Sequence, residues 1–347
     1  MKRTMKVLMT LGRYEFGGFA TTVNFLSRYL RHLGVDVTIA AMKIRESIPY
    51  SDVHELKPVE ICNEAKHYDV VHVHISFPYL YYLEKCSVKN FLLTHHGVAP
   101  LKAIPQIREK FINFFLNNVA YKFLLKNVPI IISNSYHTKE KLYKLYKINS
   151  VVIYNGVDLN IFKPNLNNRP DSAKEIIFFN PTAWKSPNRL VKHFFIIKQV
   201  FKTAKLLAIG LPQKYWHGQG IIALPRMPLE KVAELYRRSH ILLFVSEYES
   251  FGYPIVEAFA SGVPVVALYR EDARIEHLLN SRGGLFYDER MSSSLIKVVS
   301  TILENYNYFR RQALQYAQNF NWLKIALKYK KIYEIMLNIL DTKRYNA

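Results

Sequence analysis

The acidic side chains of Glu249 and Glu257 flank seven residues in the string E-S-F-G-Y-P-I-V-E. An apolar run at 241–245 precedes them and has the length of a buried strand, and Pro254 is suited to the first turn of a helix. We therefore expect Glu249 in a strand-to-helix loop and Glu257 about one turn inside the helix. Two carboxylates so placed can accept hydrogen bonds from hydroxyl groups.

Between the two glutamates, Ser250, Phe251 and Gly252 would place backbone N–H groups around the start of the same helix. Such donors and the helix dipole favour negatively charged or hydroxyl-rich ligands. The arrangement would suit a sugar ring beside one carboxylate and a ribose beside the other. Without these surroundings, a pair of glutamates is more simply interpreted as the solvated ends of a helix.

The complete string Y-E-S-F-G-Y-P-I-V-E-A-F-A-S-G-V-P-V-V resembles the donor-site signature of retaining nucleotide-sugar glycosyltransferases of family 4, the group 1 type with the GT-B fold. The resemblance implies a hexosyltransferase (EC 2.4) that moves a sugar from a nucleotide-diphosphate sugar to a hydroxyl of a lipid-linked or polysaccharide glycan, with retention of the anomeric configuration. It implies no obligatory metal and no cofactor besides the co-substrate. Glu249 would then position sugar hydroxyls, without an assured role as a nucleophile, and Glu257 would accept hydrogen bonds from the ribose.

The 347 residues are too many for one ordinary core and fit two domains of about 150 residues each. Short apolar runs alternate with amphipathic segments in both halves, which is typical of doubly wound parallel sheets. We expect two Rossmann-like α/β domains, an acceptor-side domain over 1–160 and a donor-binding domain over 161–324, with a linker composition at 162–171. The resemblance implies domains that face each other across a cleft, and a C-terminal helix at about 325–347 that crosses back to the first domain. The expected strands lie at 6–11, 35–41, 69–74, 90–94, 129–133, 175–179, 205–209, 220–223, 241–245 and 263–267.

Ligands of open α/β sheets bind at the carboxyl ends of the strands, so the loops at those ends are candidate sites. Gly17 and Gly18 follow the first expected strand, where glycine lets the backbone approach a phosphate or a sugar, although a Gly-Gly pair is often a simple turn. Within G-G-F-A-T-T-V-N-F-L they resemble the family's first-domain glycine loop. In T-H-H-G, the family pattern Thr-x-His selects His96, and not its neighbour His95, for contact with the sugar or the acceptor.

Two further motifs of the first half are interpreted as structural. His72 and His74 alternate along an expected strand and therefore face one side. Their spacing could hold a metal ion, but no carboxylate or third ligand is nearby in the sequence, and we interpret them as wall residues. The string N-G-V-D at 155–158 resembles the family's hinge motif, in which Asn155 and Gly156 would form the turn into the second domain.

The donor-phosphate motif departs from the family pattern. After the first strand of the second domain, the family carries an arginine and, five residues later, a lysine that bind the donor pyrophosphate. Lys185 stands at the lysine position, but Asn180 stands at the arginine position. The missing guanidinium removes a charge-assisted contact of roughly 1.5–3 kcal/mol, for which Arg189 or Lys192 is a candidate replacement. A glycine-rich loop of the family is also absent before Glu276, the one residue there that corresponds.

The formal net charge of +21 indicates a polyanionic partner: nucleic acid, anionic lipid headgroups or phosphate-bearing substrates. The segment 107–126 narrows the choice among these partners. Its apolar residues follow one helical face, and around that face lie Arg108, Lys110, Lys122 and Lys126. Such a helix can lie in a membrane interface, although an apolar face is more often part of a core. The expected partners are a nucleotide sugar, a glycan or lipid-linked acceptor and, on the first alternative, an anionic membrane surface; nucleic acid is disfavoured.

No apolar run approaches the roughly 18 residues of a membrane span, and the run at 7–11 is too short for the core of a signal peptide. The sequence therefore predicts a cytoplasmic protein, peripheral on the inner face of the membrane if the amphipathic segment binds there. Cys62 and Cys86 lack metal-ligand spacing, and we expect reduced thiols rather than a disulfide or a zinc site.

Three other functions stay open. A non-hydrolysing sugar-nucleotide epimerase shares the GT-B layout, but the E-S-F-G and N-G-V-D strings favour the transferase. A catalytically inactive relative that binds lipid or nucleic acid would explain Asn180 and the missing glycine loop. A DNA-modifying glycosyltransferase would suit the charge and would bind duplexes with a steep salt dependence, whereas a lipid acceptor predicts sedimentation with anionic vesicles.

Overall fold

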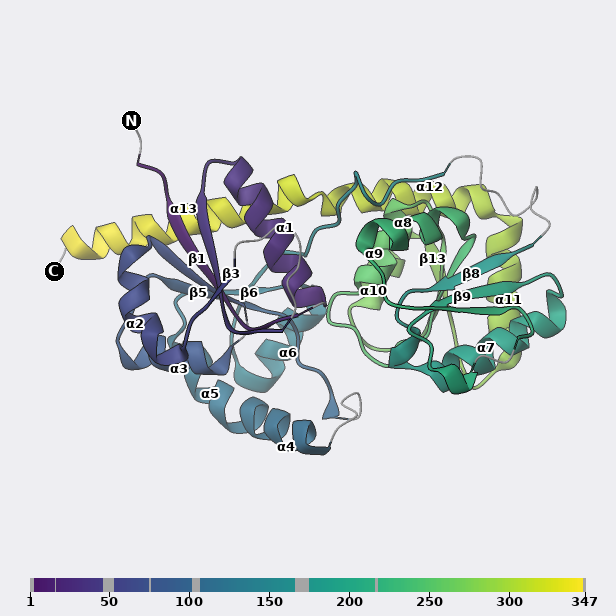
Figure 1. Ribbon diagram of the computed structural model, residues 1–347, viewed down its shortest axis with the longest axis horizontal. Helices are drawn as coiled ribbons and strands as arrows, with labels where there is room; N and C mark the ends of the chain where they lie inside the picture. Colours follow the sequence, from purple (N-terminus) through teal and green to yellow (C-terminus); the bar gives the residue numbers. More distant parts are fainter. Residues whose placement is uncertain are drawn as a thin grey trace. The chain divides into compact units, whose positions relative to one another are not determined.

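The chain forms two compact units (Figure 1). The computed structural model describes residues 3–15, 17–45, 53–74, 76–101, 107–165, 175–215 and 218–345. The first unit comprises Met1–Gly156 and Trp322–Ala347, and the second comprises Val157–Asn321. The sequence-based boundaries were 160 and 324. Of the expected linker, residues 166–171 lie outside the described part of the chain.

The first unit is built on a seven-stranded parallel sheet in the order β3-β2-β1-β4-β5-β6-β7. Alternate residues of β1 face opposite sides, so Val7 and Met9 pack in one apolar core while Leu8 packs in the other. The strands are β1 (Lys6–Tyr14), β2 (Asp36–Ile44), β3 (Val53–Glu55), β4 (Val70–His74), β5 (Phe91–His95), β6 (Ile131–Ser133) and β7 (Val151–Val152). The helices are α1 (Gly18–His32), α2 (Ile61–Glu64), α3 (Phe77–Lys85), α4 (Ile107–Phe115), α5 (Tyr121–Leu124), α6 (Tyr136–Tyr146) and α13 (Trp322–Tyr345).

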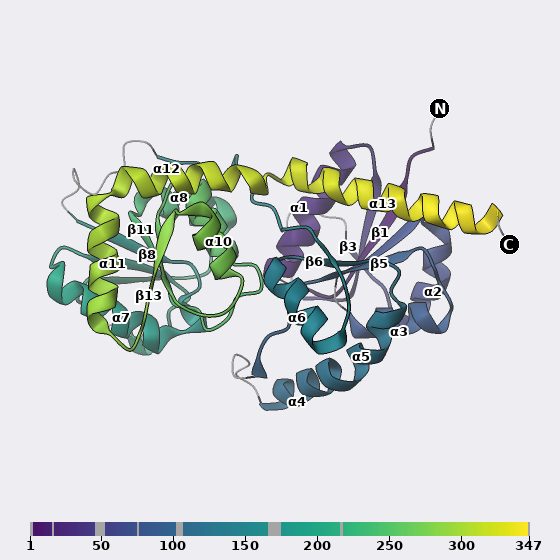
Figure 2. The same ribbon diagram turned by 180° about the vertical axis from the view of Figure 1, so that it is seen from behind.

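The C-terminal helix α13 belongs to the first unit and packs against α1, as the expected fold class required (Figure 2). Trp322, Tyr329 and Tyr333 are buried in the core that α1 shares with β1. Gly156 lies against the same tryptophan, and a Cβ there would come within 2.4 Å of the Trp322 ring. The close approach explains why the N-G-V-D string has glycine at this position.

The second unit is built on a six-stranded parallel sheet in the order β10-β9-β8-β11-β12-β13. One face of the sheet packs under α7 and α11 through Phe178, Phe194 and Val299, and on the other face Phe179 contacts Tyr236 of α8. The strands are β8 (Ile177–Asn180), β9 (Lys205–Ile209), β10 (Ile221–Leu224), β11 (Ile241–Phe244), β12 (Val265–Leu268) and β13 (Gly284–Tyr287). The helices are α7 (Pro187–Val200), α8 (Leu229–Arg238), α9 (Tyr253–Ala260), α10 (Arg274–Ser281), α11 (Ser292–Glu304) and α12 (Tyr306–Ala317).

In both sheets the strand order reverses direction at the first strand of the unit. β1 lies between β2 and β4, and β8 lies between β9 and β11. Ligands of doubly wound folds bind beside such a reversal, at the carboxyl ends of the strands. These two points are therefore where the candidate side chains have to be examined. The two parallel α/β sheets confirm the predicted fold class.

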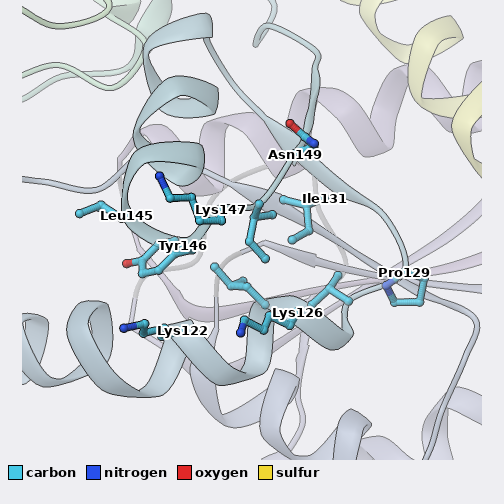
Figure 3. A pocket seen from close by; sticks show the side chains of 11 residues that line it. Lys122, Lys126, Pro129, Ile131, Leu145, Tyr146, Lys147 and Asn149 are labelled. Atoms are coloured by element: carbon cyan, nitrogen blue, oxygen red, sulfur yellow. The ribbon is translucent and has the colours of Figure 1, made fainter.

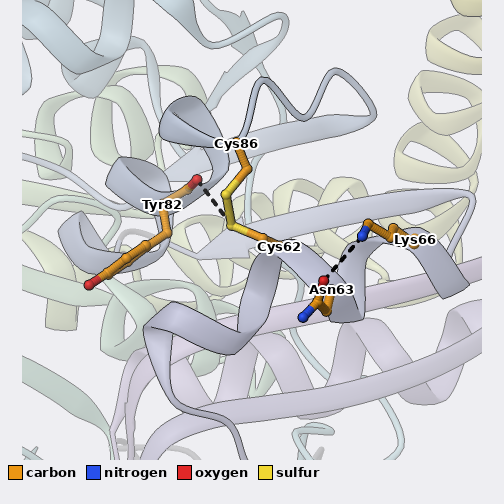
Figure 4. Close-up of a disulfide and its surroundings, with 5 residues drawn as sticks. All are labelled: Cys62, Asn63, Lys66, Tyr82 and Cys86. Carbon is orange, nitrogen blue, oxygen red and sulfur yellow. Dashed lines mark hydrogen bonds between the residues drawn. A yellow bond between two sulfur atoms is a disulfide. The ribbon is translucent and has the colours of Figure 1, made fainter.

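The expectation of two reduced thiols is wrong. Cys62 of α2 and Cys86, which follows α3, form a disulfide with a Cα–Cα distance of 6.1 Å (Figure 4). Their separation of 24 residues gave no sign of pairing, because the tertiary packing of α2 on α3 brings them together. In the chain-entropy model, a crosslink over a loop of this size stabilises the fold by roughly 3–4 kcal/mol.

The amphipathic segment 107–126 also differs from one regular helix. A π-helical turn, η4 (Leu116–Ala120), separates α4 from α5, and Phe111, Phe114 and Phe115 are exposed. The interpretation of this apolar face as core is therefore wrong. Within the described ranges, no helix is both long enough and apolar enough to cross a membrane.

Candidate functional site

Lys185 and Glu249 form an ion pair at the carboxyl end of the second sheet. β8 pairs with β11, so the loops that follow these two strands emerge side by side. Lys185 lies in the short helical turn after β8 and its Nζ is 2.7 Å from Oε1 of Glu249, which lies in the loop after β11. The Lys185 side chain is 31% exposed and that of Glu249 is 9% exposed. The ammonium group is therefore positioned by the carboxylate and still reachable from solvent.

A second, fully buried ion pair supports the Glu249 loop. The backbone N–H of Glu249 donates to Oδ2 of Asp272 at 2.9 Å, and the Arg274 guanidinium contacts both oxygens of Asp272 at 2.8 Å. Arg274 also donates to the carbonyl oxygen of Ser246, whose own hydroxyl donates to Glu249 Oε1 at 2.8 Å. Burial raises the pKa of Asp272, against the opposing effect of Arg274. The loop that presents Glu249 is thus held from its backbone and its side chain.

Sequence reasoning missed Asp272 and Arg274. They lie in the segment after β12 where the family's glycine loop is absent, and we carried over only Glu276, which falls in the first turn of α10. The available signal was a D-x-R string in the segment after β12, a buried strand next to β11. Charged residues at the carboxyl end of a neighbouring parallel strand lie close to the same site.

Glu257 lies in α9 and is buried. Burial, and to a smaller extent the charge of Glu249, raises its pKa to about 7. The hydroxyl of Tyr236 lies 3.2 Å from Glu257 Oε2 and 3.0 Å from the carbonyl oxygen of Pro254. Since the hydroxyl has one proton and the carbonyl only accepts, protonation of Glu257 allows both contacts to be hydrogen bonds. Near neutral pH this carboxyl can therefore accept from a ligand hydroxyl or stay protonated.

The start of α9 follows from Gly252 and Phe251. Gly252 has φ 92° and precedes the first helical residue, a left-handed conformation that glycine adopts without strain. Phe251 is buried against Phe320 and His277, and its carbonyl oxygen accepts from His277 Nε2 at 2.6 Å. These contacts place Ser250, which is half-buried, just before the helix.

Both polar atoms of the Asn180 side chain are hydrogen-bonded to the main chain. Its Nδ2 donates to the carbonyl oxygen of Leu243 at 2.8 Å, and its Oδ1 accepts from the N–H of Thr182 at 2.8 Å. Arg189 pairs with Glu247 and Glu289 at 2.9 Å each, so a phosphate would compete with two carboxylates for it. Lys192 is exposed on α7.

The first unit carries a cluster of buried imidazoles at the corresponding reversal of strand order. His72 and His74 of β4 lie with ring centres 4.1 Å apart, and His74 Nδ1 is 3.0 Å from His96 Nε2. His72 also contacts Thr94 Oγ1 at 2.7 Å and the Tyr333 hydroxyl of α13 at 2.8 Å. No group of His, Cys, Asp and Glu side chains in the described ranges is arranged to hold a metal ion.

These histidines are neutral. Burial, together with neighbouring histidines, lowers the pKa of His74 and of His96 well below 6.5, and burial lowers that of His72 to about 3. In a neutral pair, one ring donates and the other accepts. His96 can therefore offer a hydrogen bond to a hydroxyl but does not act as a cationic acid at neutral pH.

The glycine loop and His95 differ in their surroundings. Gly17 and Gly18 are exposed, and a Cβ on Gly17 would meet no described atom within 4 Å. Phe19, one residue later, lies with its ring centre 4.9 Å from that of His96. His95 instead accepts from the N–H of Gly97 and packs beside Tyr121. The first turn of α1, which follows the glycine loop, thus adjoins His96 through Phe19.

Both halves of the chain match models of known protein families. Residues 16–161 match the model of Glycosyltransferase Family 4, and residues 163–320 match that of Glycosyl transferases group 1. Over 285 residues the chain is 24% identical to glycosyltransferase MJ1178 of Methanocaldococcus jannaschii, covering 78% of this chain and 76% of that protein. Over 251 residues it is 25% identical to the O-antigen chain mannosyltransferase RfbU of Salmonella typhimurium, covering 64% and 68%.

The solved structures agree on the fold. The Alr3699/HepE protein of Anabaena, crystallised with UDP and glucose, matches with a TM-score of 0.73 and 16% identity over 95% of this chain and 99% of that one. A glycosyltransferase of Rickettsia africae matches with a TM-score of 0.73 and 20% identity over 96% and 99%. The chain is a glycosyltransferase, with a family 4 domain followed by a group 1 domain.

Proposed function

We propose that the protein transfers a hexosyl group from a nucleoside diphosphate sugar to a hydroxyl acceptor with retention of anomeric configuration. The observation that carries the proposal is the Lys185–Glu249 pair at 2.7 Å, which puts a positive charge and a hydroxyl acceptor at one point. Glu257, a second buried acceptor, follows one helix turn into α9. Lys185 would contact the diphosphate of the donor, Glu249 the sugar and Glu257 the ribose.

The chemistry of the transfer follows from these groups. As the bond between the anomeric carbon and the diphosphate oxygen breaks, negative charge grows on the diphosphate, where Lys185 stabilises it. The acceptor oxygen forms the new bond from the same face, and its proton passes to the leaving phosphate oxygen. Glu249 accepts from sugar hydroxyls and Glu257 from the ribose. Because Lys185 supplies the positive charge, the proposed reaction has no obligatory metal.

The donor class is the finer part of this proposal. The Anabaena structure holds UDP and glucose, and RfbU is named as a mannosyltransferase, so UDP-glucose and nucleotide-linked mannose are the first donors to test. Because Asn180 lacks a guanidinium and its amide already serves the main chain, we assign the diphosphate chiefly to Lys185.

For the first domain we propose contacts to the acceptor or the sugar. His96 is neutral and offers one hydrogen bond, and Gly17, where a Cβ would meet no described atom within 4 Å, leaves room in the loop after β1 for a phosphate or sugar. RfbU acts on O-antigen chains according to its name, which makes a lipid-linked or polysaccharide glycan the acceptor to test.

The test is a panel of nucleotide sugars. Thermal shift would identify binding, and release of free nucleotide would identify turnover, for the wild type and for Lys185→Ala and Glu257→Ala. Lys205→Ala and Glu234→Ala are matched controls, since they remove the same charges from β9 and α8 at surface ion pairs. We expect one donor to stabilise the wild type and both controls and to lose this effect in the two site variants. Absence of binding to every nucleotide would overturn the proposal and favour an inactive relative.

A further inference from the structure

Large apolar side chains are concentrated on the exposed side of the α4–α5 segment. Ile107 is 74% exposed, Phe111 is 72% exposed and Phe123 is 69% exposed. Ile112, Phe114, Phe115 and Val119 are exposed as well. Folded domains rarely leave so many large apolar groups adjacent to one another in water unless the surface has a partner. We call residues 107–123 the apolar segment.

A cavity of about 660 Å³ adjoins the end of the same helical run, between α5, β6 and the end of α6. Figure 3 shows Lys122 and Lys126 on one helix and Tyr146 and Lys147 at the end of the other. The remaining lining residues are Leu125, Val128, Pro129, Ile131, Leu145, Ile148 and Asn149. Three lysines and an asparagine thus line this cavity together with apolar side chains, and none of the described residues that line it is acidic.

Tyr146, one of the residues that line this cavity, has a buried hydroxyl. It is 4% exposed, and its hydroxyl has no hydrogen-bond partner among the residues that the structure describes. Buried hydroxyls are nearly always hydrogen-bonded, so an unsatisfied one requires an explanation. A ligand in the cavity that offers an acceptor oxygen would supply the missing partner.

We propose that this cavity binds the phosphate group of an anionic phospholipid while the apolar segment lies in the interface of the same bilayer. Lys122, Lys126 and Lys147 would surround the phosphate, and the glycerol and first methylenes would contact Leu145, which is exposed, and Ile148, which is half-buried. Basic amphipathic helices bind anionic bilayers by such a combination of apolar burial and charge attraction. The inference deepens the proposed function, since it supplies a surface on which a lipid-linked acceptor would be met.

The chemistry favours a bilayer over nucleic acid. Both partners attract lysines, and phenylalanine can stack on unpaired bases. The isoleucine and valine side chains of the apolar segment do not stack, and the apolar residues among those that line the cavity have no counterpart on a phosphate backbone. An amphiphile with a single anionic group matches both features.

The experiment is sedimentation of the full chain with vesicles, in the absence of donor and acceptor. Vesicles of phosphatidylcholine are compared with vesicles that contain phosphatidylglycerol. Lys122, Lys126 and Lys147 are changed together to Gln, and the matched control changes the exposed Lys202, Lys214 and Lys297 of the second unit to Gln. We expect the wild type and the control to bind only the anionic vesicles. The cavity variant should bind them more weakly by about fivefold for each lysine removed.

Two further arms separate the parts of the proposal. Phe111→Ser with Phe123→Ser should weaken binding to the anionic vesicles at least tenfold, whereas Val200→Ser with Leu279→Ser, which alters exposed apolar residues elsewhere, should not. Tyr146→Phe should lower affinity for anionic vesicles, and soluble glycerol 3-phosphate should compete weakly, because it lacks the bilayer.

Equal weakening in the cavity variant and in the lysine control would reduce the effect to net charge and overturn the cavity assignment. Failure of the wild type to sediment, or stronger binding to duplex DNA than to anionic vesicles, would overturn the bilayer as the partner. Donor binding measured by thermal shift on the same samples distinguishes this failure from a failure of the proposed transferase function.

Discussion

The two candidate regions both lie at carboxyl ends of strands near the reversal of strand order in their sheets, and they differ in their electrostatics. In the second unit, Lys185 and Glu249 are charged and lie at the carboxyl ends of β8 and β11. In the first unit, His74 and His96 are neutral and lie at the carboxyl ends of β4 and β5. The topology thus selects the position of a site, and the residues at that position determine whether it suits a charged or an uncharged group.

Burial explains the difference. Lys185 remains 31% exposed, so water still solvates its ammonium group. The carboxylate of Glu249 stabilises the same positive charge as its counterion. His72, His74 and His96 are at most 4% exposed, with hydroxyls and other imidazoles as partners, and no carboxylate is hydrogen-bonded to them in the described part of the chain. The charged pair suits a diphosphate, and the neutral cluster suits hydroxyl groups.

The largest effect should come from the buried pair that supports the charged region. Arg274→Met would leave the Asp272 carboxylate without a counterion and lower the free energy of unfolding by about 3–5 kcal/mol, measured by urea denaturation. Asp272→Asn combined with Arg274→Met removes both charges and should recover much of this loss. If the single and double variants were equally unstable, the ion pair would not be the source of the support.

Lys185→Ala should reduce the transfer rate by roughly 10²–10³-fold, the usual cost of removing one electrostatic contact to a developing negative charge. The measurement is kcat with the donor identified in the panel, with Lys205→Ala as the control. Because His96 is neutral, His96→Ala should cost less than Lys185→Ala and should act mainly on KM for the acceptor or sugar. A larger loss of kcat in the histidine variant would reverse the roles given to the two regions.

Glu257 is the residue of the charged region that most resembles the neutral histidines, because burial favours the uncharged form of its side chain. Its pKa is raised from 4.5 to about 7, so the folded state holds a proton that the unfolded state releases. The stability that this provides is complete below pH 4.5 and is lost as the pH rises through about 7. Glu257→Gln should therefore gain stability relative to the wild type across this window, by up to roughly 3 kcal/mol.

Donor binding by the same variant provides the opposing measurement. Ribose hydroxyls donate to the ionised carboxylate, so the wild-type affinity should rise as the pH passes 7, and this rise should be absent in Glu257→Gln. A wild type whose donor affinity is flat between pH 6 and 8 would mean that Glu257 does not contact the ribose.

The sequence was sufficient for features that depend on local pattern. Strand-length apolar runs located β1, β9 and β11 to within a few residues, and the alternation of elements predicted two parallel sheets. Lys185 and Glu249 could each be placed in a loop after a strand, although neither the pairing of β8 with β11 nor the 2.7 Å contact between the two side chains could be predicted. A local sequence pattern therefore predicts a strand or helix and the position where it ends.

The missed features depend on tertiary packing. The Cys62–Cys86 disulfide requires α2 to lie on α3, and the support of Glu249 by Asp272 requires β12 to lie beside β11. The apolar residues of α4 have the same spacing whether they face a core or the solvent, so their exposure was not readable from periodicity. Asn180 was recognised as a departure, but its amide contacts to Leu243 and Thr182 were not.

The smallest expected effect is the coupling energy between the imidazoles of His74 and His96. A double-mutant cycle of His74→Phe and His96→Phe should give an interaction energy of about 1 kcal/mol in the free energy of unfolding, the usual value for one neutral hydrogen bond. His95→Phe, combined with His74→Phe, is the control, because Nδ1 of the His95 ring accepts from the Gly97 N–H. The three single variants also report whether each ring is needed for packing.

The pH dependence of this coupling distinguishes it from that of an ion pair. Since the pKa values of both rings lie well below 6.5 in the folded chain, the coupling should be constant from pH 6.5 to 8. Below pH 6.5 the unfolded state binds protons that the folded cluster excludes, so stability falls as the pH falls. His74→Phe should reduce that acid sensitivity. A coupling that grew on acidification would require a charged imidazole in the cluster, and the contrast between a charged and a neutral region would then be wrong.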